Sequence, residues 1–526
     1  MYSDHKILIG KSFEDNIYIY PKMANRHGMI AGATGTGKTI TLKVLAESFS
    51  DCGVPVFLAD IKGDLAGMCL NGKESDSLRK RIDALNLEDF DFHKYPVHFW
   101  DIYQKNGLPL RTTISEMGPL LLSKILGLND VQSDILTIIF SIADKENLLL
   151  LDTKDLKSMI QYVGEHTSDY TLTYGNINKQ SLGAIVRAIV ALEAEGGDLF
   201  FGEPAIRIGD WLCRNEDGKG MIEILDCQKL ILNPTMYATF MLWLLSELFE
   251  SLPEAGDLEK PKMVFFFDEA HLLFDNISKD LLDKVEQIVK LIRSKGVGIY
   301  FITQSPTDIP DGVLSQLGNK IQHALHAYTP KEQKSAKACA QSFRENPKLD
   351  TYQTLLELGI GEALISVLDE KGIPTIVQKA TILPPQSAMG AIDDQTRDQY
   401  NKNDLLYTQY HQYLDRESAY ELLLKKAETS SNQKEIEKEK KILEKEEIQK
   451  EKQRLKEEQQ LEKQIKKQQA QKQKEIKKVM SSATGTIGRE LGKSVGQSIG
   501  GNFGKKVGGN VGASICRGLL NTLMKM

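Results

Sequence analysis

The stretch Gly32-Ala33-Thr34-Gly35-Thr36-Gly37-Lys38-Thr39 decides the fold of this chain. It follows the apolar run His27–Ala31 and precedes the helical pattern Ile40–Ser48, which places a strand, a loop and a helix in succession. The spacing G-x-x-x-x-G-K-[ST] is that of a loop whose backbone amides, with the helix N-terminus, hold phosphate groups. In such a loop Lys38 bridges the β and γ phosphates, and Thr39 places its hydroxyl on Mg²⁺. The sequence therefore predicts a nucleotide site that uses all eight residues, with ATP and Mg²⁺ as cofactors.

Two other expected strands end in residues that can act on a nucleotide. The apolar run Met263–Phe267 is followed by Asp268 and Glu269. In this arrangement one carboxylate holds the metal shell and the next activates water, so we expect Asp268 to be a metal ligand and Glu269 to be catalytic. The strand Gly298–Thr303 ends at Gln304, which we expect to sense the γ-phosphate or the attacking water. No N-K-x-D motif directly follows any of the expected strands, and an additional-strand ATPase is favoured over a GTPase.

Short apolar runs alternate with longer helical patterns, which predicts an α/β fold with a mostly parallel sheet covered on both faces. The expected strands are His27–Ala31, Pro55–Asp60, Val97–Asp101, Met221–Asp226, Met263–Asp268, Gly298–Thr303 and Lys320–His326, with two more within Glu362–Leu383. The region between Asp101 and Met221 has only helical patterns. We therefore expect a core at 1–105 and 216–395, a helical insertion at 106–215, a charged helical or weakly coiled-coil segment at 396–480, and a glycine-repeat tail at 481–526.

Composition and charge narrow the class of protein. With 526 residues, 41% hydrophobic and 26% charged, the chain can bury a sizeable core and is not disordered throughout. No apolar stretch reaches the ~20 residues of a membrane-spanning helix, and no signal peptide is evident, so we expect a cytoplasmic protein. The six cysteines are scattered and never in C-x-x-C spacing, which argues against a zinc site or a disulfide framework.

The C-terminal part differs from the rest in charge and pattern. Residues 431–526 carry 22 Lys/Arg and 12 Asp/Glu, although the whole chain has a net charge of -6. A solvated charged helix explains this as well as contact with nucleic acid or anionic lipid does. Beyond it, glycine recurs at every fourth residue from Gly488 to Gly512, each time after an apolar residue. Such a stripe permits close helix packing or membrane contact, whereas a flexible tail is the alternative, so we include peripheral membrane attachment among the expectations.

Five stretches together resemble one known family. They are HGMIAGATGTGKTITLKVLAESFS, VPVFLADIKGDLAG, VFFFDEAHLLF, IRSKGVGIYFITQSPTDIP and LPPQSAMGAI. They are similar to the bacterial HerA-like NTPases, the YjgR-type branch of the HerA/FtsK superfamily, over about residues 5–392. The resemblance implies a RecA-like fold of the additional-strand class, ATP hydrolysis at subunit interfaces, and a homo-oligomer, usually a hexameric ring, that translocates on double-stranded DNA as a helicase or translocase.

The resemblance and the strand pattern suggest further site residues. In similar ATPases a basic residue near Arg293 reaches the nucleotide of the neighbouring subunit, so Arg293 is the candidate for a catalytic finger. Lys62, Gly63 and Asp64 follow the strand Pro55–Asp60 at the edge where open α/β folds bind ligands, and we expect a nucleotide or DNA role. We expect His271 to be a packing residue.

Two departures from the family pattern are expected to matter. About 25 residues precede His27–Ala31, the first expected strand, so the N-terminal barrel through which archaeal HerA proteins engage a nuclease is not expected. A nuclease partner is therefore doubtful. The tail beyond Gln395 lies outside the core family pattern and is interpreted as an assembly or anchoring device.

Three functional hypotheses remain open from sequence. The leading one is a ring-forming DNA motor that hydrolyses ATP. The second is a P-loop ATPase that remodels a protein or membrane-associated complex, which the glycine-repeat tail favours slightly. The third is a nucleotide-gated scaffold, against which the intact Asp268–Glu269 pair argues.

Overall fold

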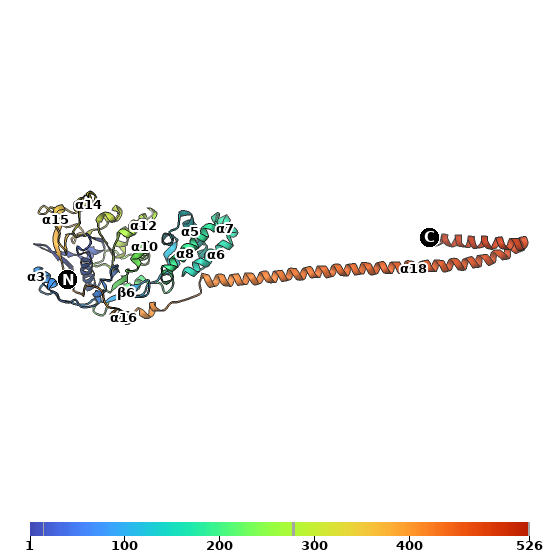
Figure 1. Ribbon diagram of the computed structural model, residues 1–526, viewed down its shortest axis with the longest axis horizontal. Helices are drawn as coiled ribbons and strands as arrows, with labels where there is room; N and C mark the ends of the chain where they lie inside the picture. Colours follow the sequence, from blue (N-terminus) through green and yellow to red (C-terminus); the bar gives the residue numbers. More distant parts are fainter. Residues whose placement is uncertain (14, 276–278, 524–526) are drawn as a thin grey trace. The chain divides into compact units, whose positions relative to one another are not determined.

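The computed structural model describes residues 1–13, 15–275 and 279–523. The chain divides into two units, Met1–Lys425 and a second unit that begins at Lys426. The first unit contains the sheet and every residue that the sequence assigns to the nucleotide site. Its elements run in the order shown by the colours of Figure 1.

Among the described residues, 13 strands form one sheet with the path β1-β2-β13-β12-β11-β4-β10-β9-β5-β8-β6-β7, and β3 pairs with β2. The strands from β11 to β7 along this path are parallel to their neighbours, whereas β12, β13, β2, β1 and β3 pair antiparallel. The strand bounds are β1 Tyr2–Ser3, β2 Lys6–Lys11, β3 Asn16–Ile19, β4 Gly28–Ala31, β5 Val56–Asp60, β6 Val97–Asp101, β7 Leu108–Pro109, β8 Ile222–Asp226, β9 Met263–Phe267, β10 Val297–Thr303, β11 Asn319–Gln322, β12 Glu362–Ser366 and β13 Gln378–Ile382.

The helices fill the connections between the strands. Their bounds are α1 Pro21–Ala24, α2 Lys38–Asp51, α3 Asp76–Ala84, α4 Ile114–Ile125, α5 Asp130–Lys145, α6 Thr153–Glu165, α7 Thr167–Tyr174, α8 Lys179–Ala194, α9 Gly197–Phe200, α10 Pro234–Ser251, α11 His271–Phe274, α12 Lys279–Leu291, α13 Asp311–Leu314, α14 Pro330–Gln341, α15 Thr351–Glu357, α16 Asp394–Lys402, α17 Tyr407–His411 and α18 Ala419–Leu523. Short 3₁₀ turns lie at η1 Ala66–Cys69, η2 Ile208–Trp211, η3 Leu230–Leu232, η4 Ile292–Lys295 and η5 Pro306–Asp308.

The parallel part of the sheet is buried on both faces. Successive residues of a strand point to opposite faces, so Phe265 and Phe267 belong to one buried cluster and Phe266 to another. Helix α2 contributes Leu42 and Leu45 to the cluster of Phe266. This burial explains why the sequence shows continuous apolar runs, and the predicted α/β fold with a mostly parallel sheet is confirmed.

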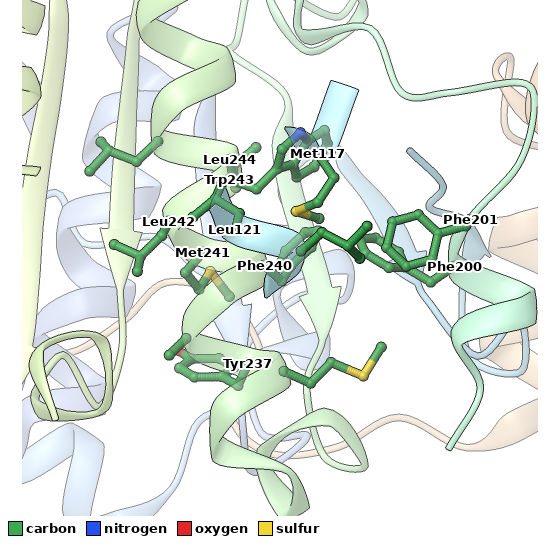
Figure 2. Close-up of a cluster of buried hydrophobic side chains, with 14 of the residues drawn as sticks. Met117, Leu121, Phe200, Phe201, Tyr237, Phe240, Met241, Leu242, Trp243 and Leu244 are labelled. Carbon is green, nitrogen blue, oxygen red and sulfur yellow. The ribbon is translucent and has the colours of Figure 1, made fainter. Parts of the chain in front are cut away.

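Helix α10 forms the centre of the opposite face. It is apolar almost all round, and its side chains from Met236 to Leu245 are buried. In Figure 2 its Tyr237, Phe240 and Trp243 lie among side chains from α4 and from the Phe200–Phe201 pair. The helix with the longest apolar stretch of the chain is thus a core helix. No helix in the described part of the chain is long and apolar enough to cross a membrane.

The segment between β7 and β8 is helical, as its pattern predicts. It holds α4 to α9, of which α5, α6, α7 and α8 lie together (Figure 1). Buried side chains of this segment, including Leu136, Met159 and Ile185, belong to the same cluster as α10 and the sheet. These helices therefore share the core of the sheet. The boundaries 106–215 for a separate insertion stay a prediction.

The sequence analysis took His27–Ala31 as the first strand of the chain. This expectation is wrong. Three strands precede β4, and β2 joins the sheet through antiparallel pairing of Gly10 and Lys11 with β13. Ile7 and Ile9 alternate with more exposed residues, so the N-terminal segment has the two-residue period of a strand. The doubt about a nuclease partner stays a prediction.

The second unit consists of the continuation of α18. The backbone is helical through Leu523, which includes the glycine repeat. The apolar side chains of residues 436–479 are exposed; Ile442, for example, is 57% exposed. The side chains of most residues of the glycine repeat, and residues 524–526, lie outside the described part of the structure, so the packing expected of the repeat stays a prediction.

Buried His27 connects three elements and generates a testable prediction. Its Nε2–H donates to the Val289 carbonyl of α12 at 2.8 Å, and its Nδ1 accepts from the Ile299 amide of β10 at 3.1 Å. Both ring nitrogens are satisfied only in the neutral form. Burial lowers the pKa of His27 to about 4 from its usual value near 6.5.

We predict that His27 makes the protein less stable as the pH falls. Because the folded state binds this proton less readily than the unfolded state, stability is lost from about pH 6.5 down to about pH 4. Urea unfolding of wild type and His27→Gln at pH 7 and pH 5 measures the effect. The wild-type advantage should shrink by up to about 2 kcal/mol at pH 5. A difference that stays constant between the two pH values would contradict this prediction.

Candidate nucleotide and hydrolysis site

The pairing of β4 with β10 and β11 brings the predicted site residues to one edge of the sheet. Ala31, the last residue of β4, pairs with Thr303 of β10 and with Gln322 of β11. Beyond these pairs the loop stays attached on both sides, because the Gly32 amide donates to the Thr303 carbonyl and the Ala33 amide donates to the Ala324 carbonyl. The loop therefore begins from a fixed position between two strands.

The conformation of the phosphate-binding loop depends on its glycines. Gly35 and Gly37 have φ angles of 82° and 117°, in the region that side chains disfavour. A Cβ on Gly32 would lie 2.6 Å from the Cβ of His323, so the loop passes too close to His323 for any side chain at this position. The Lys38 ammonium donates to the carbonyls of Gly32 and Ala33 at 2.6 and 3.1 Å. The sequence-predicted loop residues thus form a closed turn that leads into α2.

The two acidic residues after β9 lie beside this loop. Glu269 has a φ of 45°, a left-handed conformation that is unusual for a non-glycine residue and occurs often at functional sites. The turn is held because the Tyr237 hydroxyl donates to the Asp268 carbonyl at 2.5 Å and the Glu269 amide donates to Asp268 Oδ1 at 2.9 Å. Desolvation by burial, reinforced by the Glu269 charge, raises the pKa of Asp268 to about 7. Such a carboxylate gains most from a nearby cation.

A pocket between the loop and these acids has the donors that a nucleotide and a metal ion need. Its lining includes Lys38, Thr39, Asp268 and Glu269, together with Lys62 and Asp64. Burial lowers the pKa of the Lys38 ammonium, whereas the Glu269 and Asp268 charges act in the opposite direction. The set combines a hydroxyl and carboxylates, which suit Mg²⁺, with ammonium groups and loop amides, which suit phosphate. The residues that line the pocket therefore fit both a nucleotide and Mg²⁺.

Gln304 and His271 approach Glu269, whereas Arg293 does not reach the pocket of its own chain. Gln304 Nε2 lies 3.5 Å and His271 Nδ1 lies 3.3 Å from Glu269 Oε2. His271 is half-buried and lies beside the Glu269 carboxylate. It therefore contacts a site residue in addition to its expected packing role. Arg293 lies in η4, before β10, and its carbonyl accepts from Asn25. Because Gln304 follows the other end of β10, Arg293 lies at the opposite edge of the sheet.

The sequence analysis did not identify His323, which packs against the phosphate-binding loop. Its Nδ1–H donates to the Glu362 carbonyl at 2.9 Å, and its Nε2 lies 2.8 Å from Thr41 Oγ1. Since a carbonyl can only accept, the ring carries its proton on Nδ1 and accepts the Thr41 hydroxyl at Nε2. Burial lowers the pKa of His323 to about 4, which keeps the ring neutral. The sequence placed His323 inside the expected strand Lys320–His326, whereas β11 ends at Gln322 and leaves His323 beside the loop.

The backbone beside His323 also contacts the loop. The Gly361 amide donates to the Thr36 carbonyl at 2.9 Å, and a Cβ on Gly37 would lie 3.2 Å from Gly361 Cα. Arg81 of α3 donates to the Ile360 carbonyl at 3.0 Å. The start of β12 therefore lies against the phosphate-binding loop, which the sequence did not predict.

Aspartates at the ends of neighbouring strands organise the loops of the same edge. Asp60 accepts from the amides of Gly63, Asp64 and Leu65, so it fixes the segment that carries Lys62. Asp101, at the end of β6, accepts in the same way from the amides of Tyr103, Lys105 and Asn106. Burial raises the pKa of Asp60 to about 6. The recurrence of Asp directly after apolar runs is visible in the sequence.

A phosphate-binding loop between strand β4 and helix α2, with adjacent acids after β9, defines a P-loop ATPase of the RecA-like α/β class. The profile of the helicase HerA-like C-terminal family matches residues 5–507. The chain therefore belongs to this family, and the resemblance seen in the sequence is confirmed.

Two curated relatives show sequence similarity to the chain. The DNA double-strand break repair helicase HerA of Sulfolobus acidocaldarius is 21% identical over 377 residues, which cover 70% of this chain and 68% of that protein. A protein described as a probable helicase of Methanocaldococcus jannaschii is 32% identical over 120 residues, which cover 22% of this chain and 21% of that protein. The second match thus spans about a fifth of the relative's length.

Solved structures show weaker similarity. The plasmid coupling protein TrwB in complex with a non-hydrolysable ATP analogue has 13% identity and a TM-score of 0.49, covering 74% of this chain and 91% of that chain. VirB4 of Thermoanaerobacter pseudethanolicus has 15% identity and a TM-score of 0.46, covering 73% of this chain and 97% of that chain. The fold assignment rests on the strand order and the family match.

Two substitutions should separate phosphate binding from hydrolysis. Lys38→Ala should abolish nucleotide binding or turnover, because it removes the ammonium beside the loop. Glu269→Gln should bind ATP but lose turnover by about 10²-fold or more, because the group that accepts the water proton is removed. Phosphate release and titration with a fluorescent nucleotide measure the two effects, and Glu345→Gln on an exposed carboxylate is the control. Near-normal turnover in Glu269→Gln would refute the assignment.

The contact between His323 and Thr41 should tune nucleotide affinity. Thr41→Val and His323→Leu each break the hydrogen bond under the loop and should weaken binding about tenfold, since a lost buried hydrogen bond costs about 1–3 kcal/mol. The double variant should be little worse than either single one, because both remove the same interaction. Thr41→Ser keeps the hydroxyl and is the matched control. Fully additive losses of affinity would show that the contact does not support the loop.

Proposed function

We propose that this protein is an ATP-hydrolysing motor that assembles as a ring, with a hexamer as the expected form, and translocates on double-stranded DNA. The observation that carries the hydrolytic part is the conformation of Glu269, whose carboxylate lies beside Gln304 at the edge that holds the phosphate-binding loop. Family membership and the HerA relative support the DNA part.

The residues of the site have distinct roles in this proposal. Lys38 and the loop amides hold the β and γ phosphates, while Thr39 and Asp268 would hold Mg²⁺. Bound Mg²⁺ would neutralise charge that develops on the phosphates. Glu269 orients a water molecule and accepts its proton, and Gln304 holds the Glu269 carboxylate or that water in place. Lys62 and Asp64 line the same pocket, so we assign them to the nucleotide rather than to DNA.

Arg293 can take part only from a neighbouring subunit in this proposal. It lies at the amino end of β10, whereas its own nucleotide site lies at the carboxyl end. A ring in which the nucleotide lies between subunits would bring such a group to the neighbouring site. A catalytic role for Arg293 and attachment of the tail to a membrane surface stay predictions.

Double-stranded DNA should stimulate ATP turnover of the full chain several-fold. Because a motor contacts phosphates along the duplex, the stimulation should fall as salt rises from about 50 to 200 mM. Turnover is measured without DNA, with linear duplex and with single strands, and Glu269→Gln controls for contaminating ATPases. Light scattering with ATP should give about six times the chain mass of 58.9 kDa.

Each part of the proposal can fail separately. Active ATP turnover that duplex DNA leaves unchanged would refute the DNA motor and favour the alternative, an ATPase that remodels a protein or membrane-associated complex. A monomeric mass under conditions of full turnover would refute the ring.

A further inference from the structure

Three side chains with metal-binding atoms meet at the edge of the sheet opposite the nucleotide site. His98 of β6 and Glu223 of β8 are direct partners across the parallel pair, and Cys213 lies between η2 and β8. One ligand atom from each residue lies within 4.8 Å of the other two. His98 and Glu223 are the second residues of their strands, so they lie near the amino ends, away from Asp101 and Asp226.

The orientation of His98 is set from both sides of its ring. Nδ1 lies 3.1 Å from both carboxylate oxygens of Glu223, and Nε2 lies 3.6 Å from Asp404 Oδ1. A metal-bound histidine commonly directs its second ring nitrogen at a carboxylate, which holds the ring in place. Trp100 Nε1 donates to Glu223 Oε2 at 2.6 Å and fixes that carboxylate.

Two buried carboxylates share one imidazole here. The side chain of Glu223 is 0% exposed and that of Asp404 is 5% exposed, and both pair with His98. A buried carboxylate is costly unless it is paired or bound to a metal. Glu223 and Asp404 converge on a single imidazole, and a divalent cation between His98 and Glu223 would stabilise this arrangement.

The cluster opens onto a pocket through which an ion can enter. The pocket has a volume of about 840 Å³, and its lining includes His98, Cys213 and Asp404. Cys213 is half-buried at its wall and lies in an irregular segment, so its side chain can adjust.

We propose that His98, Cys213 and Glu223 bind one Zn²⁺ ion, with Asp404 as the positioning residue for His98. Ligand atoms of a tetrahedral zinc site stand about 3.3–3.6 Å apart, which the His98–Glu223 pair already approaches and which Cys213 reaches with a small movement. Binding forms a zinc–thiolate bond and a bond to His98 Nδ1, and it releases to water both the Cys213 thiol proton and the Nδ1 proton that His98 directs at Glu223. The combination of imidazole, thiolate and carboxylate suits Zn²⁺ rather than Mg²⁺, which prefers oxygen ligands alone.

The site would tie parts of the first unit together. It connects two neighbouring strands, the segment that returns from the helices between β7 and β8, and the turn between α16 and α17 that holds Asp404. Because it lies at the amino edge, zinc would act on stability and not on the chemistry at Lys38 and Glu269.

The test measures zinc in the untagged full-length protein. Metal analysis after addition of equimolar Zn²⁺ and removal of weakly bound metal with a chelator of micromolar affinity should give about one zinc per chain. Cys213→Ser and Glu223→Gln should each reduce this at least tenfold, and Asp404→Asn should weaken affinity about 10–100-fold. Cys339→Ser is the matched control, because it changes a buried thiol elsewhere that donates to Gln322.

Cobalt substitution and ATP turnover complete the test. Co²⁺ in the wild type should give a thiolate-to-metal absorption band that disappears in Cys213→Ser, while ATP turnover of this variant should stay within about twofold of wild type and show that it folds. Absence of stoichiometric zinc in the wild type would overturn the proposal. Retention of zinc by Cys213→Ser and Glu223→Gln together would also overturn it, because the ion would then bind elsewhere.

Discussion

The position of β4 between two parallel partners is the constraint on which the site depends. Its backbone hydrogen bonds to β10 and β11 align Ala31 with Thr303 and Gln322, and β9 is aligned through β10 by the pair of Phe267 and Phe301. The residues that directly follow each of these strands therefore lie at the same edge of the sheet. Contacts between the predicted catalytic side chains are long by comparison, as the 3.5 Å between Gln304 and Glu269 shows. The backbone ladder and not side-chain pairing assembles the site.

The sequence predicted what depends on local pattern. The seven expected strands of the parallel region and the phosphate-binding loop were found because a buried parallel strand is a continuous apolar run and the loop has fixed spacing. The strands β1 to β3 were missed because they are short, antiparallel and at one side of the sheet, and β7 was missed because it has only two residues, Leu108 and Pro109. His323 could not be assigned a partner, since Thr41 lies 282 residues away in the chain. Only the fold brings such residues together.

Aspartate at a strand end is used repeatedly and links the fold to the site. Asp60 and Asp101 each accept backbone amides of the loop that follows them, which offsets the cost of burying a carboxylate. Asp268 occupies the equivalent position after β9, yet it accepts only from the next amide in the hydrogen bonds described above. A carboxylate with fewer amide donors has lone pairs free for a cation. The same residue type is thus structural at two strand ends and suited to metal binding at the third.

The two edges of the sheet impose different limits on sequence interpretation. At the carboxyl edge the fixed spacing of the phosphate-binding loop predicts the nucleotide site, because this loop and the helix after it are contiguous in sequence. At the amino edge the scattered cysteines argued against zinc, since spacing along the chain detects only ligands that are close in sequence. His98 and Glu223 are 125 residues apart and meet because β6 and β8 pair in register. The lack of C-x-x-C spacing therefore excludes a zinc motif that is contiguous in sequence, but it does not exclude a zinc site formed across strands. A metal ion bound at the amino edge would leave the nucleotide site at the carboxyl edge unchanged.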